Sequence, residues 1–262
     1  MDGVNKTLYI PLYGKAFVSR KGIILNDPAA EAIWEKEQFP LKGKSRSKWL
    51  AYNMGMRSRV FDDWLTDKME DNPGAVVLHI GCGMDSRIKR LGTQGHRWYD
   101  IDFPEVIAER RRYYSEDDLY RMVAADMRDE EWKERIPQGE AALVVMEGVS
   151  MYFRPEELVE LLQRLGQHFS SVCILMDCYS VFAAKASKYK NPINDVGVTT
   201  VYGMDDAKKL AEDTGLSSVG EHSLTPLQLI GQLSAGERIV FCNLFAGRFA
   251  RKIYRLYEFQ RK

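Results

Sequence analysis

The strongest constraint on the fold is a series of short apolar runs that alternate with helical patterns. The series begins after the turn signal Asp71-Asn72-Pro73-Gly74, where the Val-rich run Ala75–Ile80 has the composition of a buried parallel strand. Further strands are predicted at Arg97–Ile101, Tyr120–Ala124, Ala141–Met146 and Val172–Asp177. Strands separated by helices form βαβ units, so the sequence predicts an α/β fold, a parallel sheet with helices on both faces.

The clearest helix begins at Pro155 and carries one apolar stripe with a period of 3.6 residues. The stripe consists of Leu158, Leu161, Leu162, Leu165 and Phe169. Another helix is predicted over Pro104–Tyr114, because proline favours the first helical turn. The elements predicted for the last third are a helix over Asp205–Thr214 that ends at Gly215, a helix near Glu237–Lys252, and strands at Ser217–Ser223 and Tyr254–Phe259.

The first 70 residues differ from the rest because they are rich in aromatic and charged residues and contain helical stretches at Pro28–Gln38 and Ser47–Met69. We expect them to form a helical cap on the sheet. The chain is thus expected to be one domain over residues 1–262. Its cap spans residues 1–70 and its sheet core 75–262, with a substrate-side insertion near 183–204.

Composition excludes several classes of function. Lys plus Arg and Asp plus Glu each total 37, and this neutral balance argues against nucleic-acid partners and against a polybasic membrane anchor. The four cysteines and four histidines lack metal-ligand spacing, so no metal site is expected. Neither a signal peptide nor an apolar run of ~18 residues is found, which predicts a cytoplasmic protein without a membrane span.

The first strand is followed by Gly81-Cys82-Gly83, a turn that lets the backbone approach a ligand closely. An acid, Asp102, stands at the carboxyl end of the second strand, about 20 residues after the glycine turn, which is the position where nucleoside-binding sheets hold a ribose hydroxyl pair. Asp100, on the same face of this strand, is the alternative.

Two more acids follow the next strand ends. Asp126 comes after the third strand and Glu147 after the fourth. Ligands of open α/β sheets bind at the carboxyl ends of the strands, so the glycine turn and the three acids predict one site.

The glycine turn favours a nucleoside without phosphates over a dinucleotide. Ser86 stands where the third glycine of a dinucleotide fingerprint would lie, and Asp85 would repel a pyrophosphate. The site therefore suits S-adenosylmethionine.

Taken together, six segments resemble the class I S-adenosylmethionine-dependent methyltransferases of the leucine carboxyl methyltransferase superfamily, and within it the TcmP-type polyketide O-methyltransferases. The segments are Tyr9–Ala16, Met56–Asp62, His79–Arg87, Trp98–Val106, Val145–Tyr152 and Lys188–Pro192. The resemblance implies a Rossmann-like, mostly parallel seven-stranded sheet. It also implies S-adenosylmethionine as methyl donor and S-adenosylhomocysteine as product.

The resemblance also implies roles for residues around the cofactor. Lys15 and Arg57 match the basic positions that hold the methionine carboxylate, and Gly81 and Gly83 match the turn beneath the methionine moiety. Asp102 matches the ribose acid. In the same way, Asp126 and Met127 match the adenine contacts, and Glu147 matches the acid near the amino-acid end of the cofactor. Arg59 is either a second basic candidate or a solvated helix charge.

On the acceptor side, Tyr152 could orient the acceptor, whereas Lys188, Tyr189 and Asn191 could line the substrate mouth. His168 has the helix spacing of a structural histidine. The expected function is O-methyl transfer to a hydroxyl or carboxylate of a small polyketide-like or aromatic metabolite. The alternatives are a protein C-terminal carboxyl methyltransferase and a non-catalytic nucleoside-binding regulatory protein. The expected partner is a small-molecule acceptor, and the expected state is a monomer or homodimer.

Overall fold

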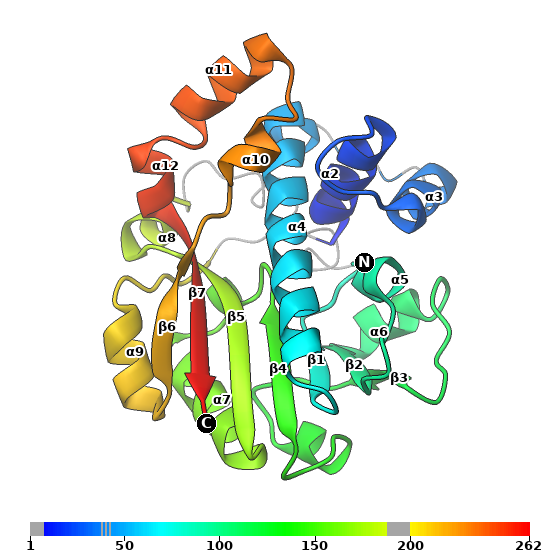
Figure 1. Cartoon of the computed structure of the whole chain (residues 1–262), viewed down its shortest axis with the longest axis vertical. Coiled ribbons are helices and arrows are strands. Elements are labelled where there is room, and N and C mark those ends of the chain that lie inside the picture. Colours follow the sequence, from blue (N-terminus) through cyan, green and yellow to red (C-terminus); the bar gives the residue numbers. More distant parts are fainter. Residues whose placement is uncertain (1–7, 38, 40, 42, 188–199) are drawn as a thin grey trace.

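A computed structural model of the protein describes residues 8–37, 39, 41, 43–187 and 200–262, and within them seven strands form one sheet (Figure 1). The strands are β1 (Val76–Ile80), β2 (Trp98–Asp102), β3 (Tyr120–Ala124), β4 (Ala141–Met146), β5 (Ser171–Tyr179), β6 (Ser217–His222) and β7 (Tyr254–Arg261). Their order across the sheet is β3-β2-β1-β4-β5-β7-β6. All seven predicted strands are confirmed, with bounds that shift by no more than two residues.

Strand order explains where a ligand can bind. The chain runs outward from β1 through β2 to β3 and then returns to the other side of β1 to form β4. These strands and β5 are parallel, whereas β7 is antiparallel to both β5 and β6. In an open α/β sheet, the crevice lies at the carboxyl ends of the strands where the order reverses. Here that point lies between β1 and β4.

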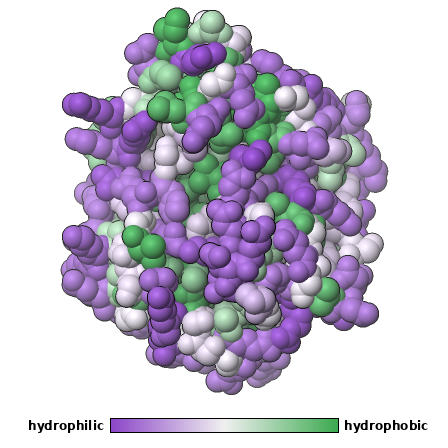
Figure 2. Space-filling model, viewed as in Figure 1, coloured by the Kyte–Doolittle hydropathy of each residue, from purple (hydrophilic) through white to green (hydrophobic). Residues whose placement is uncertain are grey.

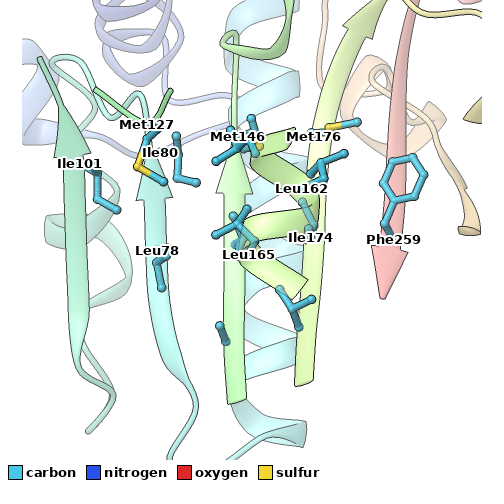
Figure 3. Packing of buried hydrophobic residues seen from close by; sticks show 14 of the residues in the cluster. Leu78, Ile80, Ile101, Met127, Met146, Leu162, Leu165, Ile174, Met176 and Phe259 are labelled. Atoms are coloured by element: carbon cyan, nitrogen blue, oxygen red, sulfur yellow. The ribbon is translucent and has the colours of Figure 1, made fainter. Parts of the chain in front are cut away.

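The two faces of the sheet carry separate cores because side chains alternate along each strand. On β1, Leu78 and Ile80 face one layer of helices and Val77 faces the other. The first layer contains α7 (Pro155–His168) and α9 (Ala207–Thr214). Leu162 and Leu165 of α7 pack against Met146 and neighbouring strand residues, as Figure 3 shows.

The second face is covered by α4 (Lys48–Asp71), which crosses the sheet in front of β1 and β4 (Figure 1). Its side chains Phe61, Trp64, Leu65 and Met69 are buried there. The Ser47 hydroxyl begins the helix by accepting a hydrogen bond from the Trp49 amide, at 3.3 Å. Helix α2 (Tyr9–Arg20) packs against α4, and α3 (Pro28–Glu37) packs against α2. The two helical stretches expected before residue 70 are therefore present as α3 and α4, whereas α2 was not predicted.

The remaining described elements are short. They are η1 (Gly43–Arg46), α5 (Arg87–Leu91), α6 (Pro104–Arg110), η2 (Glu131–Glu134), η3 (Ser150–Tyr152), α8 (Val181–Ser187), α10 (Leu227–Ile230), α11 (Ala235–Leu244) and α12 (Arg248–Ile253). On the face seen in Figure 2, hydrophobic residues gather at the end where α10 and α11 lie, and the rest is mainly hydrophilic. No described helix is long and apolar enough to cross a membrane.

Two helix predictions differ from the structure. The prediction of a single helix near Glu237–Lys252 is wrong, because Gly247 has an extended backbone (φ −70°, ψ 171°) that separates α11 from α12. The helix predicted over Pro104–Tyr114 ends at Arg110, and the following residues form turns. Most of the insertion expected near residues 183–204 lies outside the described residues.

Replacing a stripe residue of α7 tests the packing of this layer. Leu162 is fully buried, so Leu162→Ala should lower the free energy of unfolding by about 2–5 kcal/mol. Urea unfolding measures the loss. Gln167→Ala is the control because Gln167 is exposed on the same helix, and it should change the value by less than about 0.5 kcal/mol. Equal effects of the two substitutions would contradict the described packing.

Candidate functional site

A glycine turn lies at the carboxyl end of β1, beside the point where the strand order reverses. Gly81 and Gly83 have φ angles of +66° and +49°, a region that glycine adopts without steric cost. A Cβ atom at Gly81 would lie 2.2 Å from Cγ2 of Val149, in the loop after β4. The loops after β1 and β4 therefore meet closely, and glycine is needed for both the conformation and the contact.

Asp102 is the last residue of β2, and its carboxylate binds the glycine turn. Its Oδ2 accepts a hydrogen bond from the Gly83 amide and its Oδ1 one from the Phe103 amide, both at 2.8 Å. Burial raises the pKa of this carboxyl to about 6 against the effect of these two bonds. The side chain is still partly exposed, and each carboxylate oxygen has a further lone pair. Asp102 can thus accept hydroxyl groups of a ligand.

Arg57 and Glu147 form a buried ion pair at the end of β4. Arg57, on α4, donates from Nε to Oε1 of Glu147 at 3.0 Å. Its Nη1 contacts Asp177 at the end of β5 (3.1 Å) and donates to the hydroxyl of Tyr254 (2.6 Å). Within the described part of the chain, no hydrogen bond is found from Nη2. Arg57 can therefore offer one donor group to a ligand anion.

Lys15 lies in the same region but pairs with Asp85. Its Nζ is 2.8 Å from the Asp85 carboxylate, and both side chains are buried. Arg87 and Arg90 also contact this carboxylate, at 3.3 and 2.9 Å. We expected Asp85 to repel a phosphate, but these three cations neutralise its carboxylate. The charge of Asp85 therefore does not exclude a phosphate.

Beneath the turn, a chain of buried polar groups connects β1, β2 and α6. Nδ1 of His79 lies 3.2 Å from Asp100, whose carboxylate also accepts from Arg110 and from Tyr120 (2.6 Å). Arg110 donates as well to the carbonyls of Gly83 (3.0 Å) and Asp85 (2.7 Å). Asp100 is fully buried and shares its oxygens with these groups, so it supports the turn and cannot replace Asp102 as a ligand contact.

The two residues expected near the adenine, Asp126 and Met127, differ in burial. Asp126 is half-buried, and Arg128 donates to its carboxylate from Nη2 (2.5 Å) and Nε (3.0 Å). Burial opposes ionisation of Asp126, but these bonds lower its pKa. Met127 is buried in the core and lies close to Ile80 in Figure 3. Of these two residues, therefore, only Asp126 presents its side chain near the surface.

The other expected site residues are spread more widely. Tyr152 is 37% exposed and follows Glu147 in the loop after β4. Arg59 is exposed and pairs with Asp63 at 2.6 Å, away from the Arg57 pair. His168 is buried against Trp132, with Nε2 3.1 Å from the Ile136 carbonyl. Lys188, Tyr189 and Asn191 lie outside the described residues.

Sequence reasoning missed several groups of this site. Asp177 continues the series of acids at strand ends, and that regularity could have identified it. His79 is a polar residue inside an apolar strand, which is a signal for a buried polar network. Arg110 and Tyr254 carry no such signal, because their contacts depend on elements far apart in the chain.

Comparison with known proteins agrees with this geometry. Residues 5–166 match the family described as leucine carboxyl methyltransferase. The chain is 31% identical over 215 residues to the tetracenomycin polyketide synthesis O-methyltransferase TcmP of Streptomyces glaucescens. It is 28% identical over 235 residues to the S-adenosyl-L-methionine-dependent methyltransferase dpfgK of Gibberella zeae. Each match covers 80% of this chain and 78% of the relative.

Among solved structures, magnesium protoporphyrin IX methyltransferase from Synechocystis PCC 6803 shares the fold. It has a TM-score of 0.52 at 13% identity, over 90% of this chain and 94% of that chain. The fold is thus that of a Rossmann-like methyltransferase. The chain belongs to the leucine carboxyl methyltransferase family and is an S-adenosylmethionine-dependent O-methyltransferase.

The contact between the two loops can be tested by relieving it from the other side. Gly81→Ala adds both the strain of a positive φ (+66°) and a Cβ atom that crowds Val149. In a Val149→Ala background the backbone strain is the same, but the crowding methyl groups are gone. We expect Gly81→Ala to cost about 1–3 kcal/mol more of the free energy of unfolding in the wild type than in Val149→Ala. Equal losses in urea unfolding would mean that Val149 does not constrain the turn.

Proposed function

We propose that this enzyme transfers a methyl group from S-adenosylmethionine to a hydroxyl or carboxylate oxygen of a small polyketide-like or aromatic metabolite. The observation that carries the proposal is the arrangement at the carboxyl ends of β1, β2 and β4. There the glycine turn and the open carboxylate of Asp102 lie on the same edge of the sheet as Arg57 and its unused Nη2. The polyketide O-methyltransferase named among the relatives supports the acceptor class.

We assign the two ends of the donor to different residues. Arg57 and Lys15 would hold its carboxylate, because a guanidinium and an ammonium are suited to that anion. Glu147 would face the amino-acid end. Gly81 and Gly83 would lie under the methionine portion, and Asp102 would accept the ribose hydroxyls. Asp126 would accept from the adenine amine while sharing its carboxylate with Arg128, and Met127 would support that contact from below.

The chemistry requires positioning more than proton transfer. S-adenosylmethionine, when bound, supplies a methyl group on a positively charged sulfur. The protein must hold the acceptor oxygen in line with that group and exclude water, and such positioning can contribute ~7–11 kcal/mol. A carboxylate acceptor is already ionised at neutral pH, whereas a phenol with a pKa of ~10 would gain from a base.

The acceptor side is assigned to the loop after β4 and to the helices beside β5 and β7. Tyr152 would orient the acceptor, with Lys188, Tyr189 and Asn191 at the substrate mouth. Exposed aromatic rings support an aromatic acceptor: Phe182 on α8 and Phe249 on α12 are 63% and 68% exposed, with ring centroids 6.4 Å apart. Such rings can stack on a planar molecule.

Thermal unfolding with S-adenosylmethionine, S-adenosylhomocysteine and NAD in parallel tests the donor site. A ligand at 100 times its Kd adds ~2.7 kcal/mol, which raises the Tm of a chain of this size by roughly 5–10 °C. We expect that rise with both sulfur nucleosides and none with NAD. A rise with NAD alone would overturn the proposal.

Transfer of a labelled methyl group then separates the candidate acceptors. The probes are 2-naphthol, a hydroxyanthraquinone and a peptide that ends in a leucine carboxylate. Methylation of the aromatic hydroxyls supports the proposal, and methylation of the peptide alone would favour the protein carboxyl methyltransferase. Donor binding without transfer to any of a broad range of acceptors would favour the non-catalytic alternative.

The raised pKa of Asp102 predicts how donor binding depends on pH. The ionised carboxylate accepts ribose hydroxyls, so ligand binding favours ionisation of a group whose pKa is about 6 in the free protein. The affinity for S-adenosylhomocysteine should therefore rise roughly tenfold from pH 5 to pH 7 and level off above. Titration calorimetry measures the profile. Asp102→Asn removes the titrating group, and a profile that keeps its slope in this variant would exclude Asp102 as the cause.

A further inference from the structure

We propose that Asp177 and Tyr254 form a clamp that holds Arg57 in the orientation needed to bind the amino-acid end of the donor. This inference rests on the proposed donor site and adds two positioning residues to it. Asp177 lies near the end of β5, and Tyr254 is the first residue of β7. The two strands are antiparallel neighbours, side by side in Figure 1, and this pairing brings both side chains to Arg57.

The clamp is a closed set of three contacts. The Tyr254 hydroxyl donates to Oδ2 of Asp177 at 2.5 Å and accepts from Nη1 of Arg57 at 2.6 Å. The same Nη1 lies 3.1 Å from Oδ2 of Asp177. Two of the three nitrogens of Arg57 are thus used, because Nε already contacts Glu147. The geometry leaves Nη2 as the nitrogen that can meet a ligand.

The free Nη2 lies beside the loop after β4, which is part of the proposed donor site. It lies 3.3 Å from the place that a Cβ atom would take at Gly148, the residue after Glu147. The Gly148 amide donates to Oδ1 of Asp177 at 2.7 Å, and the Ser150 hydroxyl donates to the Asp177 carbonyl. One carboxylate therefore fixes both the arginine and the loop opposite it.

Electrostatics make the tyrosine hydroxyl necessary. Asp177 and Glu147 both attract the Arg57 guanidinium, and two anions alone would allow it more than one orientation. Burial raises the pKa of Tyr254, so its hydroxyl keeps its proton and donates it to Asp177. The ring is held in place by Tyr179, at a centroid distance of 4.8 Å. Tyr254 thus acts as a rigid spacer between the arginine and the acid.

The clamp predicts a selective loss when the hydroxyl is removed. Tyr254→Phe keeps the ring but lets Arg57 turn toward its two carboxylates and away from a ligand. The nucleoside end of the donor should be unaffected, because the proposed donor site assigns it to Asp102 on β2. Two nucleosides separate these effects: S-adenosylhomocysteine contains the amino-acid portion, and 5′-methylthioadenosine lacks it.

The experiment measures the Kd of both nucleosides by titration calorimetry with the full chain. Tyr254→Phe should weaken S-adenosylhomocysteine about tenfold, the scale of one lost hydrogen bond to a charged group, and leave 5′-methylthioadenosine within about twofold. Asp177→Asn should act in the same direction. The control is Tyr257→Phe on the same strand, whose hydroxyl accepts from Arg255 at 2.9 Å, and it should change neither Kd.

The outcomes separate the clamp from a general structural role and from the proposed function. Equal weakening of both nucleosides by Tyr254→Phe, or no weakening, would overturn the clamp while wild-type binding still supports the donor site. Failure of the wild-type protein to bind either nucleoside would overturn the proposed function, and the clamp with it. A loss restricted to S-adenosylhomocysteine supports the clamp, and Arg57→Lys provides a further check. In that variant the additional Tyr254→Phe change should have little effect.

Discussion

The ion pairs around Arg87 are the interaction on which the rest of the site depends. Arg87 is fully buried between α4 and the sheet, where it contacts Asp62 (2.7 Å), Asp85 and Glu147. Removing one partner of such a buried pair costs about 3–5 kcal/mol, because the other charge stays buried without compensation. Helix α4, the turn after β1 and the loop after β4 are therefore held together, because each carries a carboxylate that needs the charge of Arg87.

This network also connects the two ends of the site. From Arg87, contacts lead to Glu147 and Arg57 on one side. On the other side they lead through His79 (3.0 Å) and Asp100 to Arg110, which holds the carbonyls of the glycine turn. Burial and the neighbouring Arg87 lower the pKa of His79, so its imidazole stays neutral and can link a cation to an anion. The glycine turn is thus supported from below by polar groups, which fixes its backbone before any ligand binds.

The sequence predicted those features that are caused by local patterns, and it did not predict contacts between elements far apart in the chain. Strands β3 and β4 have the predicted bounds because apolar runs between turn residues define them, and the glycine turn meets Asp102 because adjacent parallel strands bring their ends together. The partners of Lys15 and Arg57 depend instead on the approach of α2 and α4 to the sheet. No local pattern signals that approach. The break at Gly247 was missed because a single glycine is compatible with either one helix or two.

The same network explains why this edge of the sheet suits a donor without phosphates. A pyrophosphate needs cations or free amides at the glycine turn, but the Gly83 amide is bonded to Asp102, and Arg87 and Arg90 are paired with Asp85. The exclusion does not come from the charge of Asp85 itself, since that charge is neutralised. It comes from the use of each of these donors within the protein. Arg57 differs because Glu147 binds its Nε and the clamp of Asp177 and Tyr254 binds its Nη1. Its Nη2 therefore remains to bind a single carboxylate.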